Sequence, residues 1–207
     1  LPSVSSVAVS PAEARADSTV ECLTTGATDA DGDAVIVHIS WTVDGTEVGT
    51  GPTISEGFSK GDNLVCTATP HDGEGSGEAE WASVWVVNSP PSLESVAISP
   101  DPLTASDSAE CVPEGAADVD GDALTFEIDW IVNGGFPTPG TATLDWDLSF
   151  GDTVQCAMTP SDGTDLGAQV VSSVRTVTGG PPIVSSAAFT PASPRTDDTL
   201  SVSVVTA

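Results

Sequence analysis

Positive charge is scarce in this sequence. Only 4 Lys+Arg residues stand against 31 Asp+Glu residues in a chain of 207, and the formal net charge is −27. A surface this acidic repels phosphate backbones and anionic membrane surfaces, which argues against nucleic-acid and membrane partners. No apolar run approaches the roughly 18 residues that a bilayer requires, so we expect no membrane insertion.

Catalytic motifs are missing as well. The sequence has no Gly-x-Ser-x-Gly, no glycine-rich phosphate loop and no His-Glu-x-x-His. The chain contains two similar segments, and when these are aligned its two histidines, His38 and His71, match Glu127 and Ser161. This favours exposed polar positions over a catalytic role. We therefore expect no enzymatic activity.

Tyrosine is absent and methionine occurs once, whereas glycine (20) and proline (16) are frequent. We find no convincing stretch of apolar residues at helical spacing. Hydrophobic residues make up 39% of the chain, which is enough for packed cores and argues against disorder. This composition is typical of strands and turns.

A tandem repeat organises the chain. Val7-Ala8-Val9-Ser10-Pro11 recurs after 89 residues as Val96-Ala97-Ile98-Ser99-Pro100, and after a further 91 as Ala187-Ala188-Phe189-Thr190-Pro191. The first two copies match along their length, at the pairs Cys22/Cys111, Asp29/Asp118, Asp31/Asp120, Asp33/Asp122, Trp41/Trp130, Cys66/Cys156 and Asp72/Asp162.

The repeat predicts the domain bounds: residues 1–89, residues 90–180, and the first strands of a third copy in residues 181–207. Asn88-Ser89-Pro90-Pro91 and Gly179-Gly180-Pro181-Pro182 are the expected linkers, which paired prolines make stiff and extended. Because the third copy stops before its acidic loop, we expect a piece of a longer array.

Each repeat alternates apolar and polar residues with period two, which indicates half-buried antiparallel strands. In the second copy Leu124, Phe126, Ile128 and Trp130 share one phase. Asp44-Gly45 and Asn133-Gly134 follow the Trp strands directly, and both are hairpin-turn signals.

The order Cys22, Trp41, Cys66 and its sister order Cys111, Trp130, Cys156 resemble the immunoglobulin-fold pattern. The Asp-x-Asp-Gly-Asp loop before the Trp strand is similar to bacterial Ig-like and polycystic-kidney-disease-type (PKD) tandem repeats of surface or secreted proteins. This resemblance covers the whole chain. It implies an all-β fold of tandem Ig-like antiparallel β-sandwiches, two complete and a third partial.

In such sandwiches the cysteines would pair within each repeat, as the disulfides Cys22–Cys66 and Cys111–Cys156. Four buried free thiols are the alternative. A cysteine metal site is disfavoured because no Cys-x-x-Cys is present. Disulfides would indicate an oxidising compartment, hence an extracellular or cell-surface location, and the resemblance implies a secreted bacterial protein.

The acidic loops are the sharpest chemical feature. Three carboxylates within five residues repel one another, and Ca²⁺ prefers such oxygen ligands, so calcium is a candidate cofactor. The candidate metal ligands are Asp29, Asp31, Asp33, Asp118, Asp120 and Asp122. The alternative is that they are solvated turn formers whose side chains bond their own backbone. Sequence alone does not place Asp72 and Asp162.

Trp81 and Trp85 occur only in the first repeat, where the second has Val171 and Arg175. Four residues apart on a strand, they share a face. They are candidate contact residues for sugar or for a neighbouring subunit; alternatively they cover a sheet or a joint between repeats.

These features predict a structural or interaction module, a disulfide-stapled spacer of an extracellular fibre, filament or stalk. An adhesin or carbohydrate-binding module and an accessory domain of a secreted hydrolase are the alternatives. The expected partners are copies of itself or adjoining repeats, end to end. Since two strands alone cannot bury a core, residues 183–207 would be completed by strand pairing.

Overall fold

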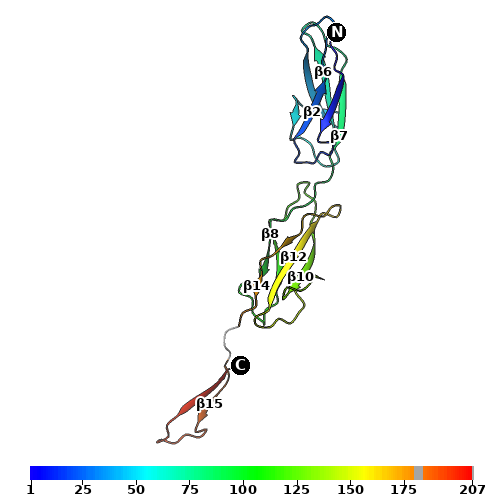
Figure 1. The fold of residues 1–207 in the computed structure, drawn as a ribbon. Helices are drawn as coiled ribbons and strands as arrows, with labels where there is room; N and C mark the ends of the chain where they lie inside the picture. The colour runs from blue at the N-terminus through cyan, green and yellow to red at the C-terminus, as the bar shows by residue number, and fades with distance from the viewer. Residues whose placement is uncertain (180–183, 207) are drawn as a thin grey trace. The chain divides into compact units, whose positions relative to one another are not determined.

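The computed structural model describes residues 1–179 and 184–206. Residues 180–182 of the second expected linker, and residues 183 and 207 of the expected pairing segment, lie outside the described residues. The described chain is built of strands β1 to β16 (Figure 1). In this part of the chain no helix is long and apolar enough to cross a membrane.

The chain divides into two compact units. One comprises Leu1–Ser95, Pro113–Glu127 and Met158–Val170, and the other comprises Val96–Val112, Ile128–Ala157 and Val171–Ala207. The first unit thus holds the first repeat together with two segments of the second, each made of a loop and the adjoining strand ends. The bounds that the sequence repeat suggests, 1–89, 90–180 and 181–207, stay a prediction.

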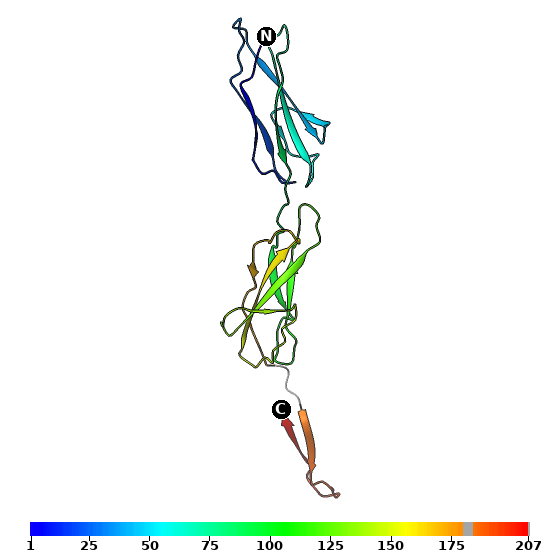
Figure 2. The same ribbon diagram turned by 90° about the vertical axis from the view of Figure 1, so that its right-hand side faces the viewer.

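Two antiparallel sheets form the first repeat. One has the order β1-β2-β5, from β1 (Ser6–Ser10), β2 (Val20–Thr25) and β5 (Thr53–Ile54). The other has the order β4-β3-β6-β7, from β4 (Thr46–Thr50), β3 (Ile36–Val43), β6 (Asn63–His71) and β7 (Glu80–Trp85). The turned view of Figure 2 shows these strands. This arrangement is that of an Ig-like sandwich.

The hairpin between β3 and β4 follows from its turn residues. Val43 pairs with Thr46, so Asp44 and Gly45 form a two-residue loop. Both have positive φ, 49° and 84°, as a type I′ turn requires. Asn133 and Gly134 repeat this conformation with φ of 53° and 66°. A hairpin therefore follows each Trp strand, but in the second repeat the pairing begins at Trp130 and Thr138, so Asn133 and Gly134 turn the chain within a longer loop.

The core of the first repeat lies between its sheets. Trp41 is fully buried and donates its indole N–H to the Gly51 carbonyl at 3.0 Å, so its one polar atom is paired. β6 alternates buried and half-buried residues along its whole length. The packed cluster comprises Ala14, Val20, Cys22, Trp41, Ile54, Phe58, Leu64, Cys66, Val84 and Val86.

The second repeat has the same plan. Its sheets have the orders β8-β9 and β11-β10-β12-β13, with β14 also paired to β12. The strands are β8 (Ser95–Ser99), β9 (Glu110–Glu114), β10 (Thr125–Val132), β11 (Thr138–Gly140), β12 (Thr153–Ser161), β13 (Val170–Val171) and β14 (Arg175–Thr176). Trp130 is buried and donates to the Thr141 carbonyl at 2.9 Å, as Trp41 does to Gly51.

Both predicted disulfides are present, Cys22–Cys66 and Cys111–Cys156. The Cα atoms of each pair are 6.1 Å apart, within the range that a disulfide spans. Cys22 lies on β2 and Cys66 on β6, so the first bond joins the two sheets of its sandwich. The fold is therefore all-β with Ig-like β-sandwiches, as the sequence predicted.

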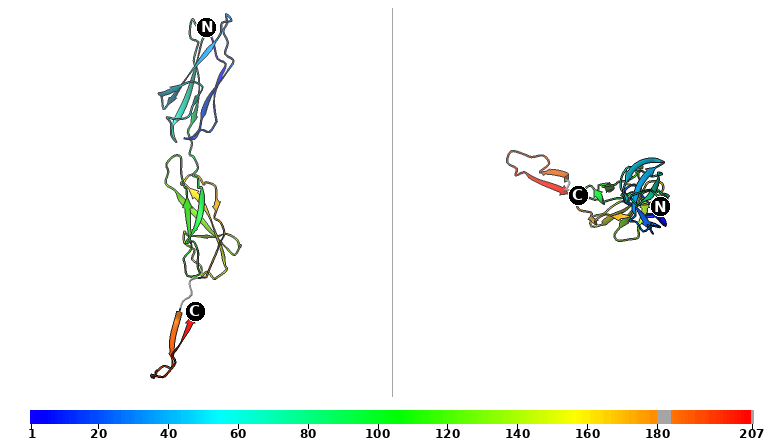
Figure 3. Two further views of the ribbon diagram at one scale, coloured as in Figure 1. Left: turned by 90° about the vertical axis from the view of Figure 1, so that its left-hand side faces the viewer. Right: turned by 90° about the horizontal axis from the view of Figure 1, so that it is seen from above.

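The third repeat contributes a hairpin of β15 (Val184–Thr190) and β16 (Ser201–Thr206). The two strands run side by side as a two-stranded ribbon (Figure 3). Every residue of β15 is exposed, including Phe189. Within the described residues this hairpin encloses no core of its own.

Candidate functional site

The acidic loop of the second repeat is folded around one carboxylate. Asp118 Oδ1 accepts the backbone N–H of Asp120 at 2.9 Å and that of Asp122 at 3.1 Å. Asp29 in the first repeat accepts the N–H of Asp31 at 2.7 Å in the same way. These bonds are the turn-forming contacts that the sequence offered as one interpretation. They occupy one oxygen of each first aspartate.

The other oxygen of each first aspartate is buried without a donor. Neither Asp118 Oδ2 nor Asp29 Oδ2 has a hydrogen-bond partner among the described residues. The Asp29 side chain is only 1% exposed, and the Leu1 α-ammonium, 3.6 Å away, is its one ion-pair partner there. The Asp31 N–H bond is the main cause that lowers the pKa of Asp29, so this carboxyl is held in its charged form.

Asp162 completes an acidic cluster that the sequence did not predict. Carboxylate oxygens of Asp118, Asp122 and Asp162 all lie within 4.8 Å of one another. Asp120, one of the predicted ligands, is not part of this cluster. It accepts hydrogen bonds from the backbone N–H and the hydroxyl of Ser89 instead, at 2.6 and 3.3 Å.

The register of the sheet explains this meeting of loops. In the first repeat Ile36, at the start of β3, pairs with His71, at the end of β6. The acidic loop before β3 and the Asp72 loop after β6 therefore emerge side by side. In the second repeat the Thr125 hydroxyl donates to the Ser161 carbonyl at 3.3 Å, which joins the corresponding strand ends.

Positive and amide groups of the same unit surround the cluster. Lys60 forms an ion pair with Asp122 and donates to the Asn88 side-chain carbonyl at 3.1 Å. The Asn88 amide donates to Asp162 at 2.7 Å and to Asp165 at 2.8 Å. The hydrogen bond to Asp122 is the main cause that raises the pKa of Lys60. The bond from Asn88 is the main cause that lowers the pKa of Asp162. Asp162 is therefore held in its charged form.

Trp81 and Trp85 lie on the outer face of β7. Their side chains are 66% and 61% exposed, whereas Val84 between them is buried. Trp81 pairs with Thr67, which in turn pairs with Ser40, so hydroxyls flank the indole across the sheet. Both side chains project outward from the sheet, and their role, as contact residues or as a cover for the sheet or for a joint between repeats, stays a prediction.

The two histidines lie together on this sheet. His38 and His71 are on the paired strands β3 and β6, and their ring centroids are 6.0 Å apart in an edge-to-face arrangement. His71 Nδ1 accepts the N–H of Gly73 at 2.8 Å. Their separation along the chain hid this contact, which strand pairing creates.

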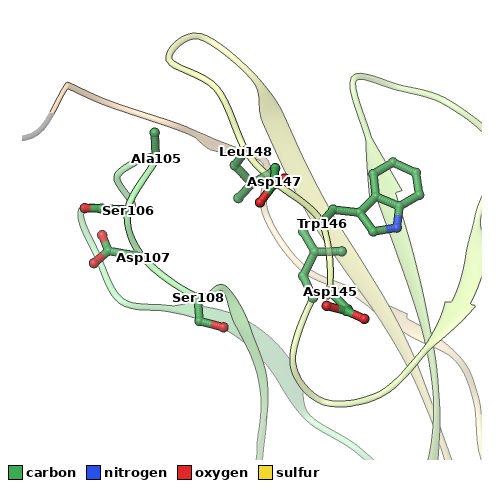
Figure 4. A pocket seen from close by; sticks show the side chains of 9 residues that line it. Ala105, Ser106, Asp107, Ser108, Asp145, Trp146, Asp147 and Leu148 are labelled. Atoms are coloured by element: carbon green, nitrogen blue, oxygen red, sulfur yellow. The ribbon is translucent and has the colours of Figure 1, made fainter.

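A shallow hollow of ≈ 390 Å³ lies in the second unit, between the loops 105–108 and 144–148 (Figure 4). Asp107, Asp145 and Asp147 contribute carboxylates to it, and Trp146, 55% exposed, stands at its side. Asp107 is bonded to the N–H and hydroxyl of its neighbour Thr104 at 2.8 and 2.7 Å. This carboxylate therefore serves its own loop.

No protein-family model and no curated protein sequence matches the chain. Among solved structures, it is similar to a segment of two fibronectin type-III domains from chicken tenascin, with 10% sequence identity and a TM-score of 0.46. The similarity covers 84% of this chain and 99% of that chain.

Proposed function

We propose that this chain is a spacer, a row of disulfide-stapled sandwiches that extends an extracellular fibre, filament or stalk. The observation that carries the proposal is the repetition of one construction. Two consecutive repeats carry the same disulfide, the same buried tryptophan bonded to a carbonyl, and the same pair of positive-φ turn residues after the Trp strand. Chemistry that is duplicated in this way serves the scaffold, because a dedicated binding or catalytic site needs only one copy.

The cysteines bear on the cellular location of such a spacer. Disulfides persist in oxidising environments, which supports the proposal of a secreted or cell-surface location. The acidic loops before each Trp strand support a relation to bacterial PKD-type repeats. The proposal includes no enzymatic activity.

Electron microscopy of the purified, oxidised chain tests the spacer function. Separate globules joined in a row are expected, and longer arrays should add globules to the row. A single compact particle that keeps its outline when repeats are added would contradict the proposal.

Carbohydrate binding is a second candidate function, and the exposed pair Trp81 and Trp85 favours it. Flat aromatic faces beside hydroxyl groups suit the stacking of sugar rings. On a glycan array, the double variant Trp81→Ala/Trp85→Ala should lose the signal of the wild type. Trp146→Ala, which removes another exposed tryptophan, should keep it. If the wild type binds no glycan on the array, carbohydrate binding is refuted.

We also propose that the third hairpin pairs with strands of an adjoining repeat or of another copy. Its exposed apolar side chains, Phe189, Val202 and Val204 among them, support this because they leave a hydrophobic surface to be covered. Removal of residues 183–207 should abolish concentration-dependent association in light scattering. Unchanged association would refute the pairing.

A further inference from the structure

We propose that Asp118, Asp122 and Asp162 form a Ca²⁺ site, in which the loop after β12 supplies a ligand that the sequence did not predict. Asp29, Asp33 and Asp72 hold the same alignment positions in the first repeat. The inference goes beyond the spacer function and does not depend on it. The chain can be a spacer that binds no calcium, and it can bind calcium as part of a binding module.

The spacing of the oxygens suits one ion. Ca²⁺ binds carboxylate oxygens at about 2.3–2.6 Å, so two ligands of one ion lie at most about 5 Å apart. One carboxylate oxygen from each of the three aspartates meets this limit, because these three atoms lie within 4.8 Å of one another. They come from two loops, and Ca²⁺ tolerates the irregular geometry that loops provide.

The buried oxygen of the first aspartate is an independent sign of a missing ligand. Asp118 Oδ2 is enclosed and accepts no hydrogen bond within the part of the chain that the structure describes. Its counterpart Asp29 Oδ2 likewise accepts no hydrogen bond, but the Leu1 α-ammonium lies 3.6 Å from it. Turn formation needs only Oδ1, so it leaves the buried Oδ2 of Asp118 unexplained. A bound cation would compensate it.

Lys60 lies where it would compete with the ion. Its ammonium contacts Asp122 and also experiences the charges of Asp120 and Asp162. One positive charge cannot balance three clustered carboxylates, and Lys60 does not contact Asp118 Oδ2. The ammonium therefore lowers the calcium affinity without replacing the ion.

The experiment is a CaCl₂ titration of the full ¹⁵N-labelled chain followed by amide chemical shifts. Amides of residues 118–122 and 162–165 should shift together, with a midpoint at about 10⁻⁴–10⁻³ M, the range of extracellular calcium modules. Asp162→Asn should raise this midpoint by about tenfold or more. The loop itself should persist, because an Asn oxygen can still accept the N–H groups of Thr164 and Asp165.

Two further variants make the test specific. Asp152→Asn removes a hydrogen-bonded carboxylate of the same repeat outside the cluster, and it should leave the midpoint unchanged. Lys60→Met should lower the midpoint. The proposal is overturned if the wild-type loops do not shift by about 10 mM Ca²⁺, tenfold above the weakest such modules. It is also overturned if Asp152→Asn weakens binding as much as Asp162→Asn, or if Lys60→Met does not tighten it.

Discussion

Removing the Cys22–Cys66 disulfide should cost the first repeat a large part of its stability. The two cysteines are 44 residues apart in sequence, and for a loop of this length the chain-entropy relation gives about 4 kcal/mol. Both side chains are buried, at 4% and 0% exposure, so the double variant Cys22→Ala/Cys66→Ala also leaves small cavities. These add about 1 kcal/mol or more.

A loss of about 5 kcal/mol is comparable with the total stability of many domains, about 5–15 kcal/mol. At roughly 4–8 °C per kcal/mol for a domain of this size, the melting temperature of the first repeat should fall by at least about 20 °C. Differential scanning calorimetry of the double variant measures the shift. Cys111→Ala/Cys156→Ala is the matched control, and it should lower the melting temperature of the second repeat instead. If the melting temperature of the first repeat falls by less than about 5 °C in Cys22→Ala/Cys66→Ala, the reasoning is refuted.

Three smaller predictions concern the turn, the core and the pH dependence. Gly45→Ala should destabilise the first repeat by about 1–2 kcal/mol in chemical denaturation, because an alanine is strained at its φ of 84°. The added methyl group would meet no other atom at either Gly45 or Gly49, so Gly49→Ala, which has no positive φ, is the control and should cost less. Trp41→Phe should cost about 1–3 kcal/mol by the same assay, since it leaves the Gly51 carbonyl without its donor; a neutral effect would contradict this role. The Asn133 side chain, and then the Ser149 N–H, lower the pKa of Asp152 below its ordinary 3.8. The stabilisation by this carboxylate is therefore complete above pH 3.8 and is lost as the pH falls through the lower folded value. Thermal melts should show Asp152→Asn less stable than wild type at pH 6 but not at pH 2.

Much of the fold could be predicted because its signals are local. Alternation in Leu64, Cys66 and Ala68 fixes which face of β6 is buried, and all three are fully buried. Asp44-Gly45 fixes a two-residue hairpin through its backbone preferences, and with it the pairing of β3 and β4. The repeat also predicted the disulfides, because pairing the cysteines within each copy places the same bond in both copies.

The candidate site depended on contacts that no local signal carries. Asp72 lies 39 residues after Asp33, and only the pairing of Ile36 with His71 shows that their loops are neighbours. Alternation likewise placed Trp81 and Trp85 on one face but could not say which, since the intervening Val84 is apolar too. The structure assigns the buried face to Val84.

Small-angle X-ray scattering of residues 1–180 tests the spacer function most directly. Two sandwiches that collapse into one compact body of 180 residues would have a radius of gyration of about 16 Å. A spacer requires a value well above this, together with a pair-distance distribution that has two maxima, while residues 1–89 alone should give about 12 Å. A value near 16 Å for residues 1–180 would contradict the account.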